Sequence, residues 1–282
     1  MPLPKFIYVL PNFQNPSGRT LSLARRWRLL EVAALHGVPI VEDDPYGELR
    51  FEGDPLPTLH SLDADGLVVY VGTFSKVLAP GIRLGWIAAP TAELLRTLVL
   101  AKQPSDLHTA VATQMTVERL LRDGLLERHI PRLRACYRER RDAMASALHE
   151  HFPPEVTHTH PAGGLFVWAS LRSGLDTGEL LIEALRHRVA FVPGESFHVD
   201  GTGRESMRLN FSAEPPDVLR EGIRRLGSVV ALALEAAGTP DRAAGLTADP
   251  AGRPESAGVP DHAGSAAGPA GVAESAGVPV DR

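Results

Sequence analysis

The chain has 282 residues, of which 44% are hydrophobic and 22% charged, and its formal net charge is −5. This length can bury one or two hydrophobic cores, and the mild charge gives no indication of a nucleic-acid or anionic-membrane partner. No apolar run approaches the ~20 residues that cross a bilayer, and the single cysteine, Cys136, excludes an intramolecular disulfide framework.

The first 90 residues alternate between strand-like and helix-like patterns. Residues 6–10 form a continuous apolar run, which is typical of a strand buried on both faces. Residues 38–44, which end in carboxylates, and residues 67–75 and 84–90 are also strand-like. A helical apolar pattern begins after Ser22 and ends before Gly37, a residue type that commonly follows a helix. Trp27 and Trp86 fall in these apolar patterns and are expected in the core. The alternation predicts an α/β domain with a mostly parallel sheet.

Residues 92–150 have helical patterns throughout, which we expect Pro104 and Pro131 to interrupt. Beyond Pro154 the chain changes to short strands and helices. The expected strands are 164–171, 189–194 and 206–212, and the expected helices are 177–189 and 216–238. This part predicts a second, smaller α+β domain.

From about Thr239 onward the sequence consists mainly of Ala, Gly and Pro with a few charges, and the hexapeptide ESAGVP occurs twice. Aromatic and β-branched residues are nearly absent, so this tail cannot bury enough surface to fold and is predicted to be disordered.

Polar and charged side chains cluster where the predicted strands end. They are Asn15 in NPSG, Asp43 and Tyr46 in EDDPY, Thr73, Ser75 and Lys76 in TFSK, Arg83, and Arg208 in MRLNFS. Ligands of open α/β sheets bind at the carboxyl ends of the strands. Taken singly, each cluster has an ordinary structural explanation as a turn, a cap, a buried ion pair or a solvated loop. Lys76 stands out because only three of the 29 basic residues are lysines.

Six motifs in a fixed order carry a resemblance to a known family. They are NPSG, DDPY, TFSKVLAPGIRLGW, GGLFVW, VPGESF and MRLNFS. From about residue 6 to about residue 235 the chain resembles the class I/II aminotransferases, which are fold-type I enzymes that use pyridoxal 5′-phosphate (PLP). It looks similar to the subgroup of 2-aminoadipate-type aminotransferases and the aminotransferase-like domains of MocR-type regulators. The resemblance implies the α/β PLP-dependent transferase fold, with an incomplete, mostly parallel large domain and a smaller α+β domain.

The resemblance assigns the chemistry at the cofactor ring to three residues. Lys76 matches the amine that forms a Schiff base with PLP and then moves the proton between the substrate Cα and the cofactor, which arginine cannot do. Asp43 matches the carboxylate that keeps the pyridine nitrogen protonated, so that the ring acts as an electron sink. The D-x-x-Y spacing selects Asp43 over Asp44. Tyr46 matches the phenol that hydrogen-bonds the 3′-oxygen of the cofactor.

The other matched residues bind oxygen atoms of the cofactor or the substrate. Thr73, Ser75 and Arg83 match the group that binds the phosphate, where hydroxyls and a guanidinium suit a dianion. Asn15 matches the amide that shares the 3′-oxygen and approaches the substrate carboxylate. Arg208 matches the arginine that binds the substrate α-carboxylate through a bidentate fork.

One departure from the family concerns the start of the chain, because only 14 residues precede Asn15. In the family, a longer segment there supplies a phosphate-binding turn, a residue that stacks on the cofactor, several strands and much of the dimer contact. We therefore expect three parts: residues 1–130 as the C-terminal part of the large PLP-binding domain, 131–238 as the small domain, and 239–282 as a disordered tail. We also expect an exposed sheet edge or apolar face, poor solubility and weak PLP binding.

The expected function is transfer of the amino group of an L-amino acid to a 2-oxo acid by a ping-pong mechanism in a homodimer. Two alternatives remain open: the effector-sensing domain of a MocR-type transcription regulator, whose DNA-binding segment would lie outside this sequence, and an inactive truncated remnant. No nucleic-acid or membrane partner is expected within the chain. No metal site is expected either, because the histidines near Pro153 lack acidic or cysteine ligands. The absence of a signal-peptide pattern favours the cytoplasm.

Overall fold

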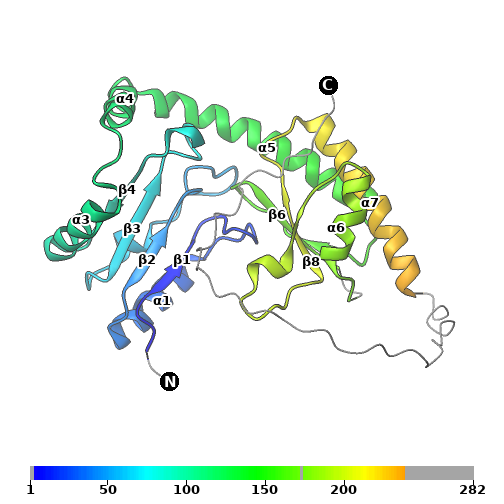
Figure 1. Cartoon of the computed structure of the whole chain (residues 1–282), viewed down its shortest axis with the longest axis horizontal. Coiled ribbons are helices and arrows are strands. Elements are labelled where there is room, and N and C mark those ends of the chain that lie inside the picture. The colour runs from blue at the N-terminus through cyan, green and yellow to red at the C-terminus, as the bar shows by residue number, and fades with distance from the viewer. Residues whose placement is uncertain (1–2, 172–173, 239–282) are drawn as a thin grey trace, which may run out of the picture.

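The computed structural model describes residues 3–171 and 174–238. The first part of the chain forms a four-stranded sheet in the order β1-β2-β3-β4. Its strands are β1 (Ile7–Val9), β2 (Ile40–Asp43), β3 (Val68–Thr73) and β4 (Gly85–Ala88). The first three strands are parallel and β4 is antiparallel to β3 (Figure 1). The mostly parallel sheet predicted from the sequence is therefore present, with an antiparallel strand at one edge.

Helix α1 (Leu23–His36) connects β1 to β2, and both of its ends follow the local sequence. The Ser22 side chain accepts a hydrogen bond from the backbone N–H of Arg25, and Gly37 has the left-handed conformation (φ 62°) of a C-terminal cap. Leu30 and Ala33 pack with Ile40 in a small core beneath the sheet. This core also includes Leu59 of the short helix α2 (Leu59–Leu62) and Val68.

The helical region contains three helices, α3 (Ala92–Asp106), α4 (Val111–Arg122) and α5 (Leu125–His151). The expected interruptions at Pro104 and Pro131 are wrong, because Pro104 lies inside α3 and Pro131 inside α5. Residues with a positive φ mark the real boundaries, with Leu107 (φ 61°) after α3 and Gly124 (φ 67°) before α5. A proline removes one helical hydrogen bond, whereas a residue with a positive φ changes the direction of the backbone.

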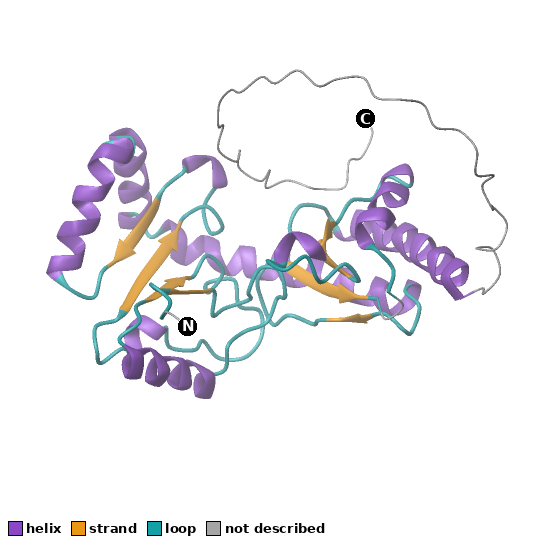
Figure 2. Cartoon of the chain, turned by 60° about the horizontal axis from the view of Figure 1, so that its bottom comes forward, coloured by secondary structure: helices purple, strands orange, loops and turns teal. Residues whose placement is uncertain are grey.

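A second four-stranded sheet is fully antiparallel, in the order β5-β6-β8-β7. Its strands are β5 (Thr157–His158), β6 (Phe166–Ser170), β7 (Val192–Pro193) and β8 (Ser206–Asn210). Helix α6 (Thr177–Arg186) and the long helices α5 and α7 (Pro216–Gly238) contribute to the same large hydrophobic core as β6 and β8. Figure 2 shows the two sheets in separate halves of the molecule, with loops between them.

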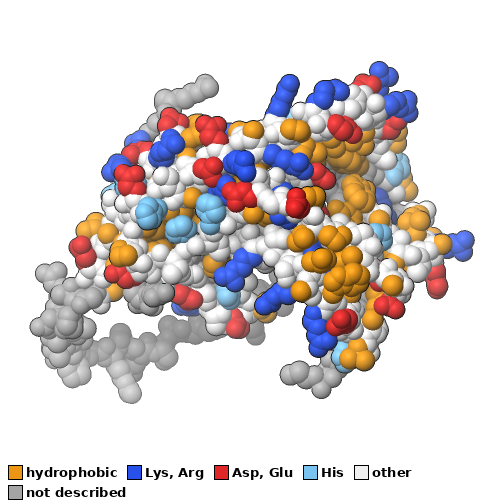
Figure 3. Space-filling model, turned by 180° about the vertical axis from the view of Figure 1, so that it is seen from behind, with side chains coloured by type: hydrophobic (Ala, Val, Ile, Leu, Met, Phe, Trp, Pro, Cys, Tyr) orange, Lys and Arg blue, Asp and Glu red, His pale blue; other side chains and the backbone are white. Residues whose placement is uncertain are grey.

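The edge strands of the first sheet are more exposed than the sequence predicted. Tyr8 on β1 is 56% exposed, and Trp86 and Ile87 on β4 are each 48% exposed. Trp27 on α1 is also 46% exposed. The prediction that Trp27 lies in the core is therefore wrong. A sheet is buried on both faces only when other elements pack on each face. An apolar run shows that a strand is suited to such packing, but not that the packing is present. Hydrophobic side chains gather over this half of the molecule in Figure 3, as expected for an apolar face without a cover.

Backbone contacts join the two halves next to the GGLFVW motif. The Gly164 N–H donates to the Leu49 carbonyl, and Arg50 forms an isolated bridge with Gly163. Gly164 has a left-handed backbone (φ 75°), and a Cβ atom there would lie 2.5 Å from the Cβ of Phe13. The motif therefore requires glycine both for its backbone conformation and for close packing.

We expect Gly164→Ala to destabilise the protein by about 2–4 kcal/mol, since backbone strain of about 1 kcal/mol adds to overpacking of about 1–3 kcal/mol. The measurement is the free energy of unfolding in urea. Gly53→Ala is the matched control, because Gly53 is also left-handed (φ 70°) but would bring its Cβ within 4 Å of no other atom. Equal losses in the two variants would contradict the packing role of Gly164.

The predicted domain boundary at residue 130 falls inside α5, a continuous helix, and it stays a prediction. The predicted tail at 239–282 lies outside the described residues. Within residues 3–171 and 174–238, no helix combines the length and the apolar character needed to span a membrane.

Candidate active site

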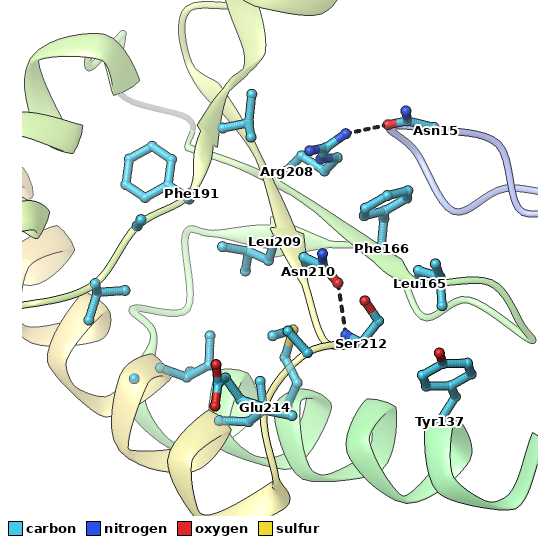
Figure 4. A pocket seen from close by; sticks show the side chains of 18 of the residues that line it. Asn15, Tyr137, Leu165, Phe166, Phe191, Arg208, Leu209, Asn210, Ser212 and Glu214 are labelled. Carbon is cyan, nitrogen blue, oxygen red and sulfur yellow. Dashed lines mark hydrogen bonds between the residues drawn. The ribbon is translucent and has the colours of Figure 1, made fainter. Parts of the chain in front are cut away.

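A cavity of about 270 Å³ brings together four of the predicted site residues from three distant parts of the chain. Asn15 comes from the loop after β1, Ser75 and Lys76 from the turn after β3, and Arg208 from the middle of β8. Figure 4 shows Arg208 and Asn15 pointing toward each other, and apolar side chains such as Phe166 and Phe191 lie around the same cavity. The cavity thus combines an amine, a guanidinium and an amide with a wall that is partly apolar.

Arg208 is held in position by two aromatic rings and an amide. Its Nη1 donates a 2.8 Å hydrogen bond to the Asn15 Oδ1. Its guanidinium carbon lies 4.3 Å from the ring centroid of Phe166 and 5.1 Å from that of Phe197. Guanidinium groups bind aromatic faces through cation–π attraction and donate hydrogen bonds from the edge of their plane. Such an arrangement suits the recognition of a carboxylate.

Lys76 is half-buried in the turn that follows β3. The turn is held by backbone hydrogen bonds from the N–H groups of Leu78 and Ala79 to the Phe74 carbonyl. At its start, the Thr73 Oγ1 accepts a 3.1 Å hydrogen bond from the Ser75 N–H. The turn therefore fixes the backbone of Lys76 at the carboxyl end of a buried strand, where ligands of parallel sheets bind.

Asp43 and Asp44, which follow each other at the end of β2, have different surroundings. The Asp43 Oδ2 accepts a 2.5 Å hydrogen bond from the Tyr8 hydroxyl. Burial raises the pKa of Asp43 above its usual value; the Tyr8 hydrogen bond opposes this and the Asp44 charge adds to it.

The Asp44 carboxylate belongs to a structural network instead. It accepts hydrogen bonds from the Asn12 Nδ2 at 3.0 Å and from the Tyr70 hydroxyl at 3.2 Å. The Asn12 Oδ1 in turn accepts a 2.6 Å hydrogen bond from the fully buried Arg26. Both Asp44 oxygens are thus engaged by the protein itself. This contrast supports Asp43 as the carboxylate that is available to a ligand.

The cavity that contains Lys76 is not lined by four of the predicted site residues, which are Asp43, Tyr46, Thr73 and Arg83. Thr73 lines a second cavity of about 540 Å³ together with Asp44 and Tyr70. Tyr46 is 3% exposed and packs edge-on against the Phe166 ring, with 5.9 Å between the centroids. Arg83 is exposed and donates a 3.3 Å hydrogen bond from its Nη1 to the Pro80 carbonyl.

Sequence reasoning missed several residues that bond to Asp43 or Asp44, directly or through Asn12. These are Tyr8, Asn12, Arg26 and Tyr70. Tyr8 carried a usable signal, because a polar hydroxyl inside the apolar run at residues 6–10 needs a partner when it is desolvated. The others carry no local signal, since their partners lie on segments distant in the sequence.

Comparisons with known proteins identify the family of the chain. A family model described as aminotransferase class I and II matches residues 4–226. The chain belongs to this family. The six ordered motifs thus identified the family correctly, and the expected fold-type I architecture is confirmed by the solved structures that resemble this chain.

Three similar proteins illustrate the range of the family. The 2-aminoadipate transaminase of Thermus thermophilus is 44% identical over 227 residues, which cover 79% of this chain and 57% of that protein. The HTH-type transcriptional regulator YisV of Bacillus subtilis is 33% identical over 220 residues, covering 78% of this chain and 45% of the regulator. The crystal structure of Pyrococcus horikoshii kynurenine aminotransferase in complex with PMP matches with a TM-score of 0.80 and 44% identity, covering 82% of this chain and 57% of that one.

The chain spans about half the length of the curated relatives that it matches. Both branches of the subgroup expected from the sequence, the 2-aminoadipate-type aminotransferases and the helix-turn-helix regulators, are represented among these relatives.

Proposed function

We propose that the protein is a PLP-dependent aminotransferase that transfers the amino group of an L-amino acid to a 2-oxo acid by a ping-pong mechanism. One observation carries the proposal: Lys76 and Arg208 line the same cavity, and Asn15 and Phe166 fix the Arg208 guanidinium there. An amine and a carboxylate-binding fork at one cavity are the two groups that amino-group transfer on an amino acid requires.

The donor set fits PLP, which supplies an aldehyde and an electron-withdrawing ring when it is bound. Lys76 would attach the cofactor covalently and then move a proton to and from the substrate Cα. Asp43 would keep the pyridine nitrogen protonated, and burial raises the pKa of its carboxyl. Arg208 would bind and orient the substrate α-carboxylate.

The remaining predicted residues have supporting roles in this proposal. Tyr46 and Asn15 would donate to the 3′-oxygen of the cofactor, and Asn15 also orients Arg208. Thr73, Ser75 and Arg83 would bind the phosphate. Ser75 and Lys76 line the same cavity.

The experiment that tests the proposal is a half-reaction with the full 282-residue chain. The chain is loaded with PLP, freed of excess cofactor and mixed with one L-amino acid at a time, with acidic, aromatic and aliphatic side chains each represented. We expect the cofactor to be converted to pyridoxamine phosphate and one equivalent of 2-oxo acid to be released. Release of no 2-oxo acid from any amino acid, by a chain that has bound PLP, would contradict the proposal.

The two neighbouring aspartates give a separate prediction. We expect Asp43→Asn to lower the rate of the half-reaction about 10²-fold, because the charge on the ring nitrogen loses its stabilising partner. Asp44→Asn is expected to lower the free energy of unfolding by about 1–3 kcal/mol instead, since its amide group leaves a donor of Asn12 or Tyr70 unsatisfied. Stopped-flow spectroscopy and urea unfolding measure the two effects. A larger loss of rate in Asp44→Asn would reverse the assignment.

A second candidate function is effector sensing in a MocR-type regulator, because the chain is 33% identical over 220 residues to an HTH-type regulator. A sensor would bind PLP and an amino acid without completing the transfer to a 2-oxo acid. The same half-reaction distinguishes the two functions, because only an aminotransferase releases a 2-oxo acid. Addition of a second 2-oxo acid then converts its cofactor back to PLP.

We also propose a homodimer located in the cytoplasm. The exposed apolar side chains of the first sheet and of α3 supply a surface for self-association, including Trp86, Ile87, Leu95, Val99 and Leu100. A single cysteine fits a reducing compartment. Sedimentation velocity over a range of protein concentrations measures the assembly, and a monomer at all concentrations would contradict it.

A further inference from the structure

Tyr8 lies on β1, the strand next to Asp43, and its side chain is on the same face of the sheet. The parallel register pairs Tyr8 with Val41 of β2, and strand alternation places Asp43 on the same face as Val41. The Tyr8 phenol therefore extends along the sheet toward the end of β2, where its hydroxyl donates the 2.5 Å hydrogen bond to the Asp43 Oδ2. This contact uses one carboxylate oxygen and leaves the other for a ligand.

A role of Tyr8 in core packing does not account for its position. Its side chain is 56% exposed and belongs to neither of the two hydrophobic cores. The second phenol–carboxylate pair of the sheet, Tyr70 with Asp44, is different. There the hydrogen bond from the phenol to the carboxylate is longer, at 3.2 Å, and the carboxylate also accepts a hydrogen bond from the buried Asn12. Tyr70 thus belongs to the structural network, whereas the main contact of Tyr8 is with the proposed cofactor-binding carboxylate.

We propose that Tyr8 is a positioning residue of the active site, which holds the Asp43 carboxylate in place and in its charged form. The inference rests on the proposed function, because it gives Asp43 its role at the ring nitrogen of PLP. A hydrogen bond to a carboxylate favours the charged form, and a charged Asp43 is what stabilises a protonated ring nitrogen. Without the phenol, the proton on the ring nitrogen would move toward the Asp43 carboxylate. The ring would then be a weaker electron sink.

The contact can be tested without cofactor, through the titration of Tyr8 in the full chain. Burial, the hydrogen bond to Asp43 and the Asp43 charge raise the pKa of the Tyr8 phenol, and Tyr46 adds a smaller effect. Asp43→Asn removes the charge and weakens the hydrogen bond, so the pKa of Tyr8 should fall by about one unit. Tyrosine labelled at Cζ gives four resonances for the four tyrosines, and Tyr8→Phe identifies the one of interest.

Asp44→Asn is the control for this titration and should leave the pKa of Tyr8 within a few tenths of a unit, because Asp44 bonds Tyr70 instead. An unchanged Tyr8 titration in Asp43→Asn would show that the hydrogen bond is not formed and would overturn the inference.

The role at the cofactor is tested with Tyr8→Phe and its matched control, Tyr70→Phe. Each variant removes one hydroxyl from a phenol that donates to a neighbouring aspartate. We expect Tyr8→Phe to raise the dissociation constant of PLP about tenfold and to lower kcat, with the KM for the amino acid unchanged, because Arg208 is not affected. Tyr70→Phe should change PLP binding less than about twofold.

The failure of this inference is distinguishable from failure of the proposed function. If Asp43→Asn impairs PLP binding or transfer and Tyr8→Phe does neither, Tyr8 is not a positioning residue while the proposed function stands. If Asp43→Asn has no effect on either measurement, the assigned role of Asp43 falls and the role of Tyr8 falls with it.

Discussion

Replacing Lys76 by arginine is expected to reduce amino-group transfer by at least about 10³-fold without unfolding the protein. Arginine keeps the positive charge and a similar length, but its guanidinium cannot form the covalent link to PLP or move a proton at neutral pH. General acid–base catalysis alone contributes about 10²–10⁴-fold, and the loss of the covalent link adds to this. The half-reaction with an amino acid measures the rate, and circular dichroism checks the fold.

The low lysine content of the chain makes the control unusually clear. Besides Lys76 the chain has only Lys5 and Lys102, and Lys102 forms an exposed ion pair with Asp106. Borohydride reduction of the PLP-loaded chain followed by peptide mass spectrometry should place the cofactor on Lys76 alone. Lys102→Arg should retain labelling and rate. Cofactor fixed on Lys5 or Lys102, or full activity of Lys76→Arg, would contradict the assignment.

The sequence predicted those parts of the structure that depend on local hydrogen bonds and on periodicity. Ser22 and Gly37 predicted the ends of α1, because caps are formed by neighbouring residues. The order of strands and helices predicted the mostly parallel first sheet and the separate second sheet. The prediction that prolines interrupt the helices was wrong, because Pro104 and Pro131 lie within α3 and α5. Leu107 follows the end of α3 and Gly124 precedes the start of α5.

The surroundings of the site could not be predicted in the same way, because they depend on contacts between distant segments. Arg208 is 193 positions from its partner Asn15, and nothing local shows that Phe166 and Phe197 lie on its guanidinium. Asp43 and Asp44 are alike in the sequence. They differ because strand alternation turns successive side chains in opposite directions, toward Tyr8 in one case and toward the network of buried Arg26 in the other.

Replacing Arg208 by lysine is expected to lower kcat/KM for the amino acid about 10²-fold, mainly through a higher KM. Lysine keeps the charge but can donate only as a point charge, so one of the two parallel hydrogen bonds to a carboxylate is lost. It would also lose the planar contact with the rings of Phe166 and Phe197 and the hydrogen bond to Asn15. Steady-state kinetics with the best amino acid of the half-reaction panel measures both constants.

Arg204→Lys is the matched control for this prediction. Arg204 lies four residues before Arg208, is exposed, and forms ion pairs with Asp176 and Glu195 on the surface, so its replacement should leave kcat/KM within about twofold. The dissociation constant of PLP adds a second test, because Arg208 is proposed to bind the substrate and not the cofactor. Loss of PLP binding in Arg208→Lys equal to its loss of kcat/KM would place Arg208 at the cofactor, whereas unchanged PLP binding with a raised KM would place it at the substrate carboxylate.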